Sequence, residues 1–573
     1  MTVQSNFQRV FVSVAFAVLL LPFLTFNSNF IKNSIITAGI PLGIFYYPRS
    51  YSASEGLLNI GEYFSGNVAN NDISAEFIML ADLFQRISYK YLGENIVVSY
   101  KVLSLLYLSI WIYFLSQLTL SSNSPTSIRP YVLTATGLLI FFNTESNFNE
   151  NYNFSRIISP QFSILIWIVF VYLIYLYFRY QKLQNRQLKI LLTLPFMLFV
   201  SSATYLFSFL SILGTSIVFL LYLVREKKTK HVLMLIPMGL LSICPFAYNA
   251  YSNIGSAEFS QVLTRMGLLE SRLPGGIRNL AICAIVFFFI HVAQKIPSNQ
   301  LSNSEFKLTL MISNSGLLLA GLSNVITGKS IQFYHFETYS LVLLLLVLVK
   351  ILSLVLDYIS IRIKVPRNSQ YLVMTIALFS LLVQVSTLDY DFNNSYREFF
   401  VKNFKNDDNL IVDVENLKYS IPIYSNSKVL YQGDIIAYGF SDKEIMIRYF
   451  LTTGCSDIEQ VRLIPGLFEY QGEPLYQKGK QVFRYLSYLN LENEFTHLYL
   501  PLLKKASEVR RKNESVIQNF IAEYRNYNCF QLAREYDIDY IVFEEKSNWN
   551  KIPNELQIFT YKVDKKKLFV AKI

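Results

Sequence analysis

The feature that most constrains this chain is a series of long apolar runs across its first two-thirds. Many of these runs approach the length of about 20 residues that an α-helix needs to cross a bilayer. Of the 573 residues, 52% are hydrophobic and only 16% are charged, whereas about a quarter of an average soluble protein is charged. The mean hydropathy is +0.33. The sequence therefore predicts an α-helical protein that crosses a membrane many times.

Eleven apolar segments are candidate spans. They are Arg9–Phe26, Ile96–Leu118, Tyr131–Phe142, Phe162–Phe178, Leu191–Val200, Tyr205–Val224, His231–Tyr251, Ile277–Ala293, Leu308–Val325, Phe333–Ile359 and Tyr371–Thr387. The third and the fifth are short for spans, and Ile35–Tyr47 is shorter than a comfortable crossing, so we expect it to be re-entrant or interfacial. Val10–Phe26 resembles a signal peptide, but it lacks a small-residue cleavage site and more spans follow, so we interpret it as a span.

Three short basic loops orient the predicted spans. They are Phe178–Lys189, Arg225–His231 and Ile361–Arg367, and short loops rich in lysine and arginine stay in the cytoplasm. Counting spans from these loops predicts a cytoplasmic N-terminus and an extracytoplasmic C-terminal region, in the cytoplasmic (inner) membrane of a bacterium. Because many basic residues lie in such loops, the net charge of +11 indicates topology, and we expect no binding to nucleic acid.

Two regions of different composition divide the chain. Residues 1–387 are predicted to form the transmembrane module, and residues 388–573 a separate extracytoplasmic α/β domain. The second region has short β-rich runs at 409–414, 421–425 and 539–545, helical spacing over Ser515–Tyr536 and a closing β-hairpin over 558–573. Cys455 and Cys529 both fall in it, and the sequence leaves open whether they form a disulfide or stay as two buried thiols.

The first predicted outer loop, residues 27–95, contains candidate catalytic carboxylates. Two amphipathic stretches, 54–64 and 72–92, suit helices that lie on a membrane surface, and Asp72 is placed to cap the second. A carboxylate can act as a general base on a hydroxyl group. We predict Asp72 and, second, Glu55 in this role; the alternative is that these acids are solvated helix caps and faces.

Further polar residues gather on the same predicted side, at the ends of later spans. They are Arg156, Arg272, Lys329, Gln332, His335 and Glu337. Arginine and lysine form charge-assisted hydrogen bonds to phosphate, and ionisable groups in a span are functional by default. We therefore predict that they bind the phosphate or pyrophosphate of a lipid-linked ligand. The alternative is a polar rim that water satisfies.

The spacing of these residues predicts which of them can contact the same ligand. On a helix that starts near Gln332, His335 lies on the same face through the i,i+3 spacing, while Glu337 points elsewhere. We expect Lys329, Gln332 and His335 to address one ligand together, and Glu337 to orient a neighbour or cap the cavity. No Cys/His spacing in the chain is typical of a metal site.

The plan of the whole chain resembles the GT-C superfamily of membrane glycosyltransferases, in an uncharacterised bacterial branch. The segments RIISPQFS (156–163), LTRMGLLESRLPGG (263–276) and TGKSIQFYHFETYS (327–340) are similar to segments of that group, as are IPIYSNSKVLY (421–431) and LAREYDIDYIVFEE (532–545) of the outer domain. The resemblance implies a polyprenyl-phosphate sugar as donor, an inverting transfer with a loop carboxylate as base, and a role in building cell-envelope glycans. The acceptor would be a glycan, a lipid or a protein.

One feature of GT-C enzymes is missing. They carry a pair of adjacent acids soon after the first span, and Asn27–Ser54 contains no acid. A non-catalytic GT-C-like protein is therefore one alternative. A transporter or polymerase of lipid-linked glycans is another, although few charges stand at the centres of the spans and no internal repeat is evident, as a transporter would favour.

Overall fold

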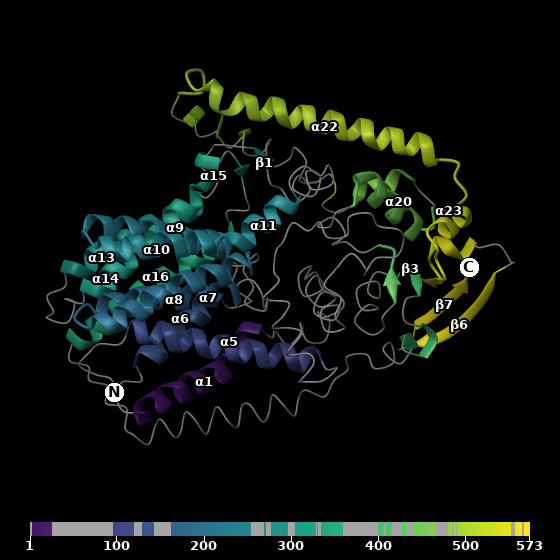
Figure 1. Ribbon diagram of the computed structural model, residues 1–573. Coiled ribbons are helices and arrows are strands. Elements are labelled where there is room, and N and C mark those ends of the chain that lie inside the picture. The colour runs from purple at the N-terminus through teal and green to yellow at the C-terminus, as the bar shows by residue number, and fades with distance from the viewer. Residues whose placement is uncertain are drawn as a thin grey trace.

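The computed structural model has a helical N-terminal part and a C-terminal part built around a small β-sheet (Figure 1). In the first part it describes residues 3–25, 96–119, 129–142, 162–253, 269–270, 277–295, 304–327, 329–330 and 334–358. In the second part it describes residues 399–400, 402–405, 408–414, 417, 427–431, 440–455, 458–464, 467, 479–480, 482–483, 486–488, 490–551, 556–563 and 566–573. The predicted boundary at 387/388 lies outside the described residues.

Ten of the eleven predicted spans coincide with helices. These are α1 (Val3–Thr25), α5 (Ile96–Thr119), α6 (Arg129–Phe142), α7 (Ser163–Arg179), α8 (Gln184–Ser202), α9 (Leu206–Arg225), α10 (Thr229–Ser242) with α11 (Cys244–Asn253), α13 (Ile277–Lys295), α14 (Ser304–Gly321) with α15 (Ser323–Thr327), and α16 (Tyr334–Tyr358). The eleventh, Tyr371–Thr387, lies outside the described residues, as do the two amphipathic stretches of the first loop.

Four described stretches of helix are long and apolar enough to cross a membrane by length and composition. They are Val102–Thr119, Leu206–Arg225, Thr229–Tyr248 and His335–Ser353. Shorter apolar helices cover Gln8–Leu20, Ser163–Arg179 and Arg278–Val292. The helical character of the first part is therefore clear, and four of its helices are compatible with a membrane protein.

The predicted span His231–Tyr251 forms two helices that meet at Ile243, and the stretch Thr229–Tyr248 across that junction is long and apolar enough to cross a membrane. Pro245, the second residue of α11, explains the break. Proline has no N–H group and its ring clashes with the carbonyl group four residues earlier, so it interrupts a helix but is tolerated in the first turn of a new one.

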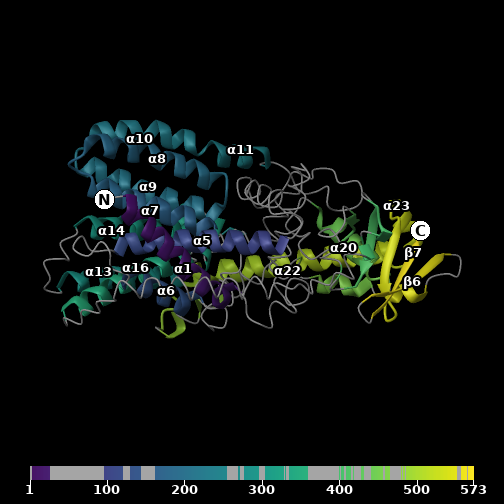
Figure 2. The same ribbon diagram turned by 90° about the horizontal axis from the view of Figure 1, so that it is seen from below.

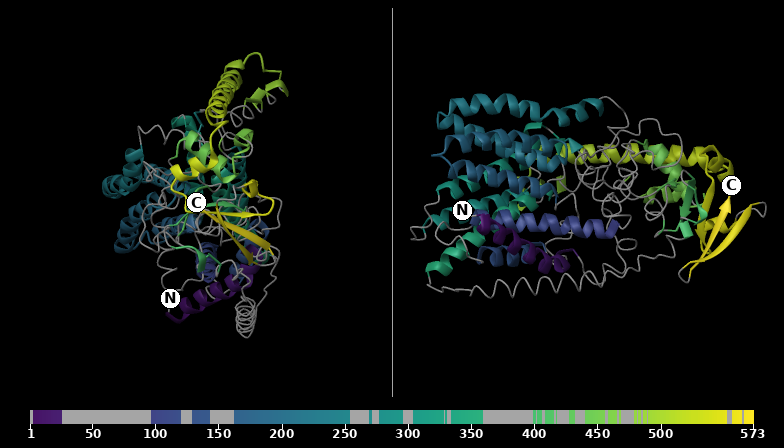
Figure 3. Two further views of the ribbon diagram at one scale, coloured as in Figure 1. Left: turned by 90° about the vertical axis from the view of Figure 1, so that its right-hand side faces the viewer. Right: turned by 60° about the horizontal axis from the view of Figure 1, so that its bottom comes forward.

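Contacts between helix ends show which ends lie together. Near the start of α9, Ser208 Oγ donates a 3.0 Å hydrogen bond to the carbonyl oxygen of Ser163 at the start of α7. Tyr177 Oη, near the end of α7, lies 2.9 Å from Nδ1 of His231 at the start of α10. The helices α7 to α10 therefore run side by side in alternating directions (Figure 3). The ends next to two of the basic loops, Phe178–Lys189 and Arg225–His231, therefore lie together, and the third loop lies outside the described residues.

The C-terminal sheet has five strands in the order β4-β3-β5-β7-β6. Figure 2 shows β7 and β6 side by side at its edge. Its strands are β3 (Asn409–Asp413), β4 (Lys428–Val429), β5 (Tyr540–Glu544), β6 (Gln557–Val563) and β7 (Lys566–Lys572). The first three are parallel, and β7 is antiparallel to both β5 and β6. The predicted strands at 409–414 and 539–545 and the closing hairpin are confirmed, while the run at 421–425 lies outside the described residues.

Helices accompany this sheet: α20 (Asp442–Thr452), α22 (Thr496–Tyr524) and α23 (Cys529–Glu535), with the 3₁₀ turns η4 (Ile458–Leu463) and η5 (Asn548–Lys551). Ser441 caps α20, because its Oγ accepts a hydrogen bond from the N–H group of Glu444. Asn528 caps α23 in the same way. The predicted helix over Ser515–Tyr536 is thus the end of α22, a turn and α23.

The structure joins Cys455 and Cys529 in a disulfide bond, with 5.9 Å between their Cα atoms. Cys455 follows the end of α20, and Cys529 is the first residue of α23. The disulfide therefore links two helices of the α/β domain. Of the two alternatives that the sequence leaves open, the structure has the bonded pair.

Candidate functional site at one end of the helical bundle

The first turn of α16 carries His335, one of the predicted ligand-binding residues. The ring of His335 is half-buried, and its centroid lies 4.2 Å from that of Phe207. Its Nδ1 lies 3.4 Å from Oη of Tyr205, the residue that precedes α9. When Tyr205 donates to Nδ1, the neutral imidazole carries its proton on Nε2, which can donate to an anionic oxygen. We call this part of the bundle, where α7, α9 and α16 begin, the His335 end.

Glu337 lies on a different side of α16. Two residues along a helix correspond to a rotation of about 200°, so His335 and Glu337 point in nearly opposite directions. Glu337 is buried, and Ser340, one turn further on the same face, donates a 2.5 Å hydrogen bond to Asn279 Oδ1 of α13. His335 therefore faces α9, whereas Glu337 lies on the side of α16 that packs against α13.

A buried polar network holds α13, α14 and α16 together near this end. Besides the bond from Ser340 to Asn279, Asn314 Nδ2 of α14 donates a 2.9 Å hydrogen bond to the carbonyl oxygen of Cys283 in α13. All four side chains are buried. Polar side chains that pair across helices hold apolar bundles in one arrangement. The network therefore fixes the position of α16, and with it the position of His335.

Two segments that the sequence places on the same side are joined by their backbones. Strand β1 (Leu269–Glu270) pairs antiparallel with β2 (Lys329–Ser330), so that Glu270 lies opposite Lys329. Arg272 follows β1 by two residues in the sequence, and α16 begins four residues after β2. The strands β1 and β2, one from each of these segments, therefore meet just before α16 in the chain, a pairing that the sequence analysis does not predict.

The other predicted site residues are not all placed by the structure. The backbone of Lys329 is described as part of β2. The predicted bases and three of the predicted ligand-binding residues lie outside the described residues; they are Asp72, Glu55, Arg156, Arg272 and Gln332. Their roles, and the shared face of Gln332 and His335, remain predictions.

The opposite end of the bundle contains buried charged residues that the sequence analysis missed. Arg9 Nη1 of α1 donates a 2.8 Å hydrogen bond to Gln117 Oε1 of α5, and Gln117 Nε2 donates one of 2.9 Å to Tyr131 Oη of α6. Lys350 Nζ of α16 lies 3.3 Å from the carbonyl oxygen of Thr119. One signal was available, because Lys350 interrupts the apolar run of its own predicted span.

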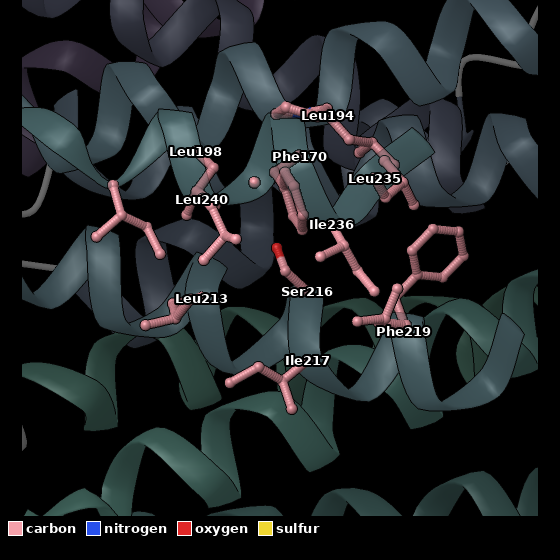
Figure 4. A pocket seen from close by; sticks show the side chains of 14 residues that line it. Phe170, Leu194, Leu198, Leu213, Ser216, Ile217, Phe219, Leu235, Ile236 and Leu240 are labelled. Atoms are coloured by element: carbon pink, nitrogen blue, oxygen red, sulfur yellow. The ribbon is translucent and has the colours of Figure 1, made fainter. Parts of the chain in front are cut away.

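An apolar cavity of about 190 Å³ lies between α7, α8, α9 and α10 (Figure 4). Its lining consists of Phe170, Leu194, Pro195, Leu198, Leu213, Ser216, Ile217, Phe219, Leu220, Leu235, Ile236, Gly239, Leu240 and Ile243. The hydroxyl group of Ser216 is the one polar side-chain group in this lining. Ile217, Ile236 and Leu240 are exposed, so the cavity opens to the surface of the bundle. None of the predicted site residues that the structure describes lines it, and its apolar lining suits a hydrocarbon chain.

Neither a metal site nor a known relative identifies this chemistry. Within the parts of the chain that the structure describes, no three His, Cys, Asp or Glu side chains are grouped as metal ligands would be. The candidate site therefore rests on three features. The imidazole of His335 lies against the start of α9, the strands β1 and β2 pair just before α16 in the chain, and an apolar cavity is lined by the middle of α9. Comparison of the chain with protein-family models and with curated proteins finds no match.

Proposed function

We propose that the protein is a GT-C-like glycosyltransferase of about eleven spans in the bacterial cytoplasmic membrane. It transfers a sugar from a polyprenyl-phosphate donor to an acceptor at the outer face. Its N-terminus lies in the cytoplasm, and the α/β domain and the His335 end lie outside. Nucleotide sugars are absent on that side of the membrane, whereas a lipid-linked donor that has been flipped is present there.

The observation that carries this proposal is the double role of α9. The start of α9 contacts His335 through Tyr205 and Phe207, and the middle of α9, from Leu213 to Leu220, lines the apolar cavity. Phe207 and Leu213 are six residues apart, which is about 9 Å along a helix. A ligand with a phosphate head and a long hydrocarbon tail needs a polar end and an apolar surface, and α9 contributes to both.

In the proposed reaction, His335 and Lys329 donate hydrogen bonds to the phosphate, and Arg156 and Arg272 add positive charge. A loop carboxylate, Asp72 or Glu55, removes the proton from the acceptor hydroxyl group as its oxygen attacks the anomeric carbon of the sugar. The bond from that carbon to the phosphate oxygen breaks, and polyprenyl phosphate leaves with the electron pair.

The first test is donor binding by the purified protein in nanodiscs. Replacing His335 by alanine removes one hydrogen bond to a charged group, so we expect the affinity for polyprenyl phosphate to fall about tenfold, which equals about 1.4 kcal/mol. His231→Ala is the matched control, because His231 also contacts a tyrosine but at the opposite end of the bundle. Its affinity should stay at the wild-type value.

Thermal unfolding of the same preparations separates binding from folding. If His335→Ala lowers the melting temperature and leaves the affinity unchanged, His335 is only a packing residue at the rim of the bundle. The reaction itself is tested in cells that lack the protein, by mass spectrometry of membrane lipids and envelope glycans. We expect a lipid-linked sugar to accumulate and one glycan to lose that sugar; unchanged lipids and glycans would contradict glycosyl transfer.

A further inference from the structure

Within the described residues, the C-terminal half of the long helix α22 makes the side-chain contacts with the α/β domain. Phe520 is buried there, with its ring centroid 6.2 Å from that of Phe450 in α20. Arg462 of η4 donates a 2.7 Å hydrogen bond to Glu514. This bond and that from Gln518 lower the pKa of Glu514 to about 2, so the pair stays ionised at neutral pH. Glu514 marks the end of the attached half.

The N-terminal half of α22 packs against the described helical residues 479–480, 482–483 and 486–488, and we call these residues and this half of α22 the hairpin. Figures 1 and 3 show α22 extending from the sheet toward the helical bundle. Within the hairpin, the rings of Phe483 and Tyr499 lie 5.2 Å apart, and Gly479 packs against Leu503. The chain turns at Asn490, whose φ of 52° is one that asparagine tolerates. The hairpin has its own small core and points away from the sheet.

Large apolar side chains are exposed on this hairpin. The exposed fractions are 41% for Phe483, 77% for Tyr488, 37% for Phe495 and 41% for Leu500. Within the described residues of the C-terminal part, large exposed apolar side chains outside the hairpin are fewer: Tyr527, Ile558 and Phe559. Apolar surface that gathers in one place on a folded domain marks an interaction site.

Basic residues stand next to the exposed apolar residues. Residues 479–512 contain seven lysines and arginines and three acids. Lys504 and Lys505 follow Leu500 by about one helical turn, and Arg511 and Lys512 follow about two turns later; all four are exposed. Two of the acids, Glu492 and Glu494, lie at the tip, so the positive charge is concentrated on α22 behind it.

We propose that this hairpin binds the outer surface of the membrane. Its exposed aromatic residues lie among the lipid headgroups, and Lys504, Lys505, Arg511 and Lys512 contact the phosphates of anionic lipids. Tyrosine and phenylalanine are favoured at this level of a bilayer, and basic residues beside them are attracted to anionic lipids. The hairpin would thereby fix the α/β domain close to the membrane. The inference requires that the bundle spans the membrane, but it does not depend on sugar transfer.

The test uses the full chain in nanodiscs with a spin label at Tyr488→Cys. Cys244→Ser removes the exposed free thiol, while Cys283 is buried and the other two cysteines are bonded. One set of nanodiscs contains phosphatidylethanolamine and phosphatidylglycerol, and the other contains only phosphatidylcholine. In the anionic nanodiscs we expect the label to be more accessible to oxygen, which dissolves in lipid, than to a water-soluble nickel chelate.

Charge reversal provides the matched comparison. Lys504→Glu, Arg511→Glu and Lys512→Glu together should make the label accessible to the nickel chelate in anionic nanodiscs. Lys562→Glu, Lys567→Glu and Lys572→Glu change the same number of charges on β6 and β7 and should leave the label in lipid. A label that faces water in the anionic nanodiscs overturns the proposal. So does a label that is shielded to the same degree in lipid-free detergent, which would indicate contact with protein.

Discussion

A single added methyl group at Gly316 is expected to destabilise the helical bundle by about 3 kcal/mol, the upper part of the usual range for overpacking. A Cβ atom at Gly316 of α14 would lie 2.4 Å from Cα and 2.5 Å from N of Thr215 in α9. The contact is equally close from the side of α9, because a Cβ atom at Gly214 would lie 2.4 Å from the carbonyl oxygen of Gly316. Backbone atoms cannot rotate out of the way, so α9 and α14 would have to separate.

The experiment compares two glycines that both lie inside helices. Gly316→Ala should lower the melting temperature of the purified protein or prevent its accumulation. Gly239→Ala in α10 is the control, because no atom outside the neighbouring backbone of its own helix lies within 4 Å of the position where its Cβ atom would be. Alanine favours a helix over glycine by about 1 kcal/mol, so this variant should be as stable as the wild type or more stable. Equal melting temperatures for the two variants would contradict the close contact between α9 and α14.

This contact illustrates what the sequence does not reveal. The apolar runs predict where the helices lie, because each run has the length and composition of a span. Gly214 and Gly316 are about a hundred residues apart, and neither stands out in its own helix. Which helices touch depends on the shapes of both surfaces, which a single sequence without an alignment does not display. The same limit applies to the pairing of β1 with β2.

Sequence rules that consider only neighbouring residues also failed where contacts between distant residues decide the structure. Pro501 is the sixth residue of α22, although proline normally ends a helix. The helix predicted from Ser515 covers only the last third of α22, and the sequence analysis missed the projecting hairpin. At the site, it identified His335 and Glu337 as unusual because they open an apolar run, but it could not show that Tyr205 and Phe207 contact His335. Those contacts come from another helix.

Loss of the disulfide between Cys455 and Cys529 should have the largest effect on stability. The two cysteines are 74 residues apart, and closing a loop of that length stabilises a fold by about 4 to 5 kcal/mol in the loop-entropy model. Cys455 has a φ of 50° and follows Gly454, whose φ is 72°. The turn after α20 thus has two consecutive residues with left-handed φ values. We expect Cys455→Ser with Cys529→Ser to leave the α/β domain sensitive to a protease at temperatures at which the wild type resists it.

Cys244→Ser is the control for this substitution, because Cys244 is exposed and unbonded on α11, and its loss should leave protease resistance unchanged.

The disulfide bond also indicates on which side of the membrane the α/β domain lies. Disulfides persist outside the cytoplasm and are rare within it. Peptides containing Cys455 and Cys529 should therefore be linked when protein from cells treated with a thiol-blocking reagent is digested without reduction. Blocked, unlinked peptides would contradict both the bond and the proposed outer location of the domain. Linked peptides combined with undiminished protease resistance in the double variant would support the location, and would show that the bond contributes little to stability.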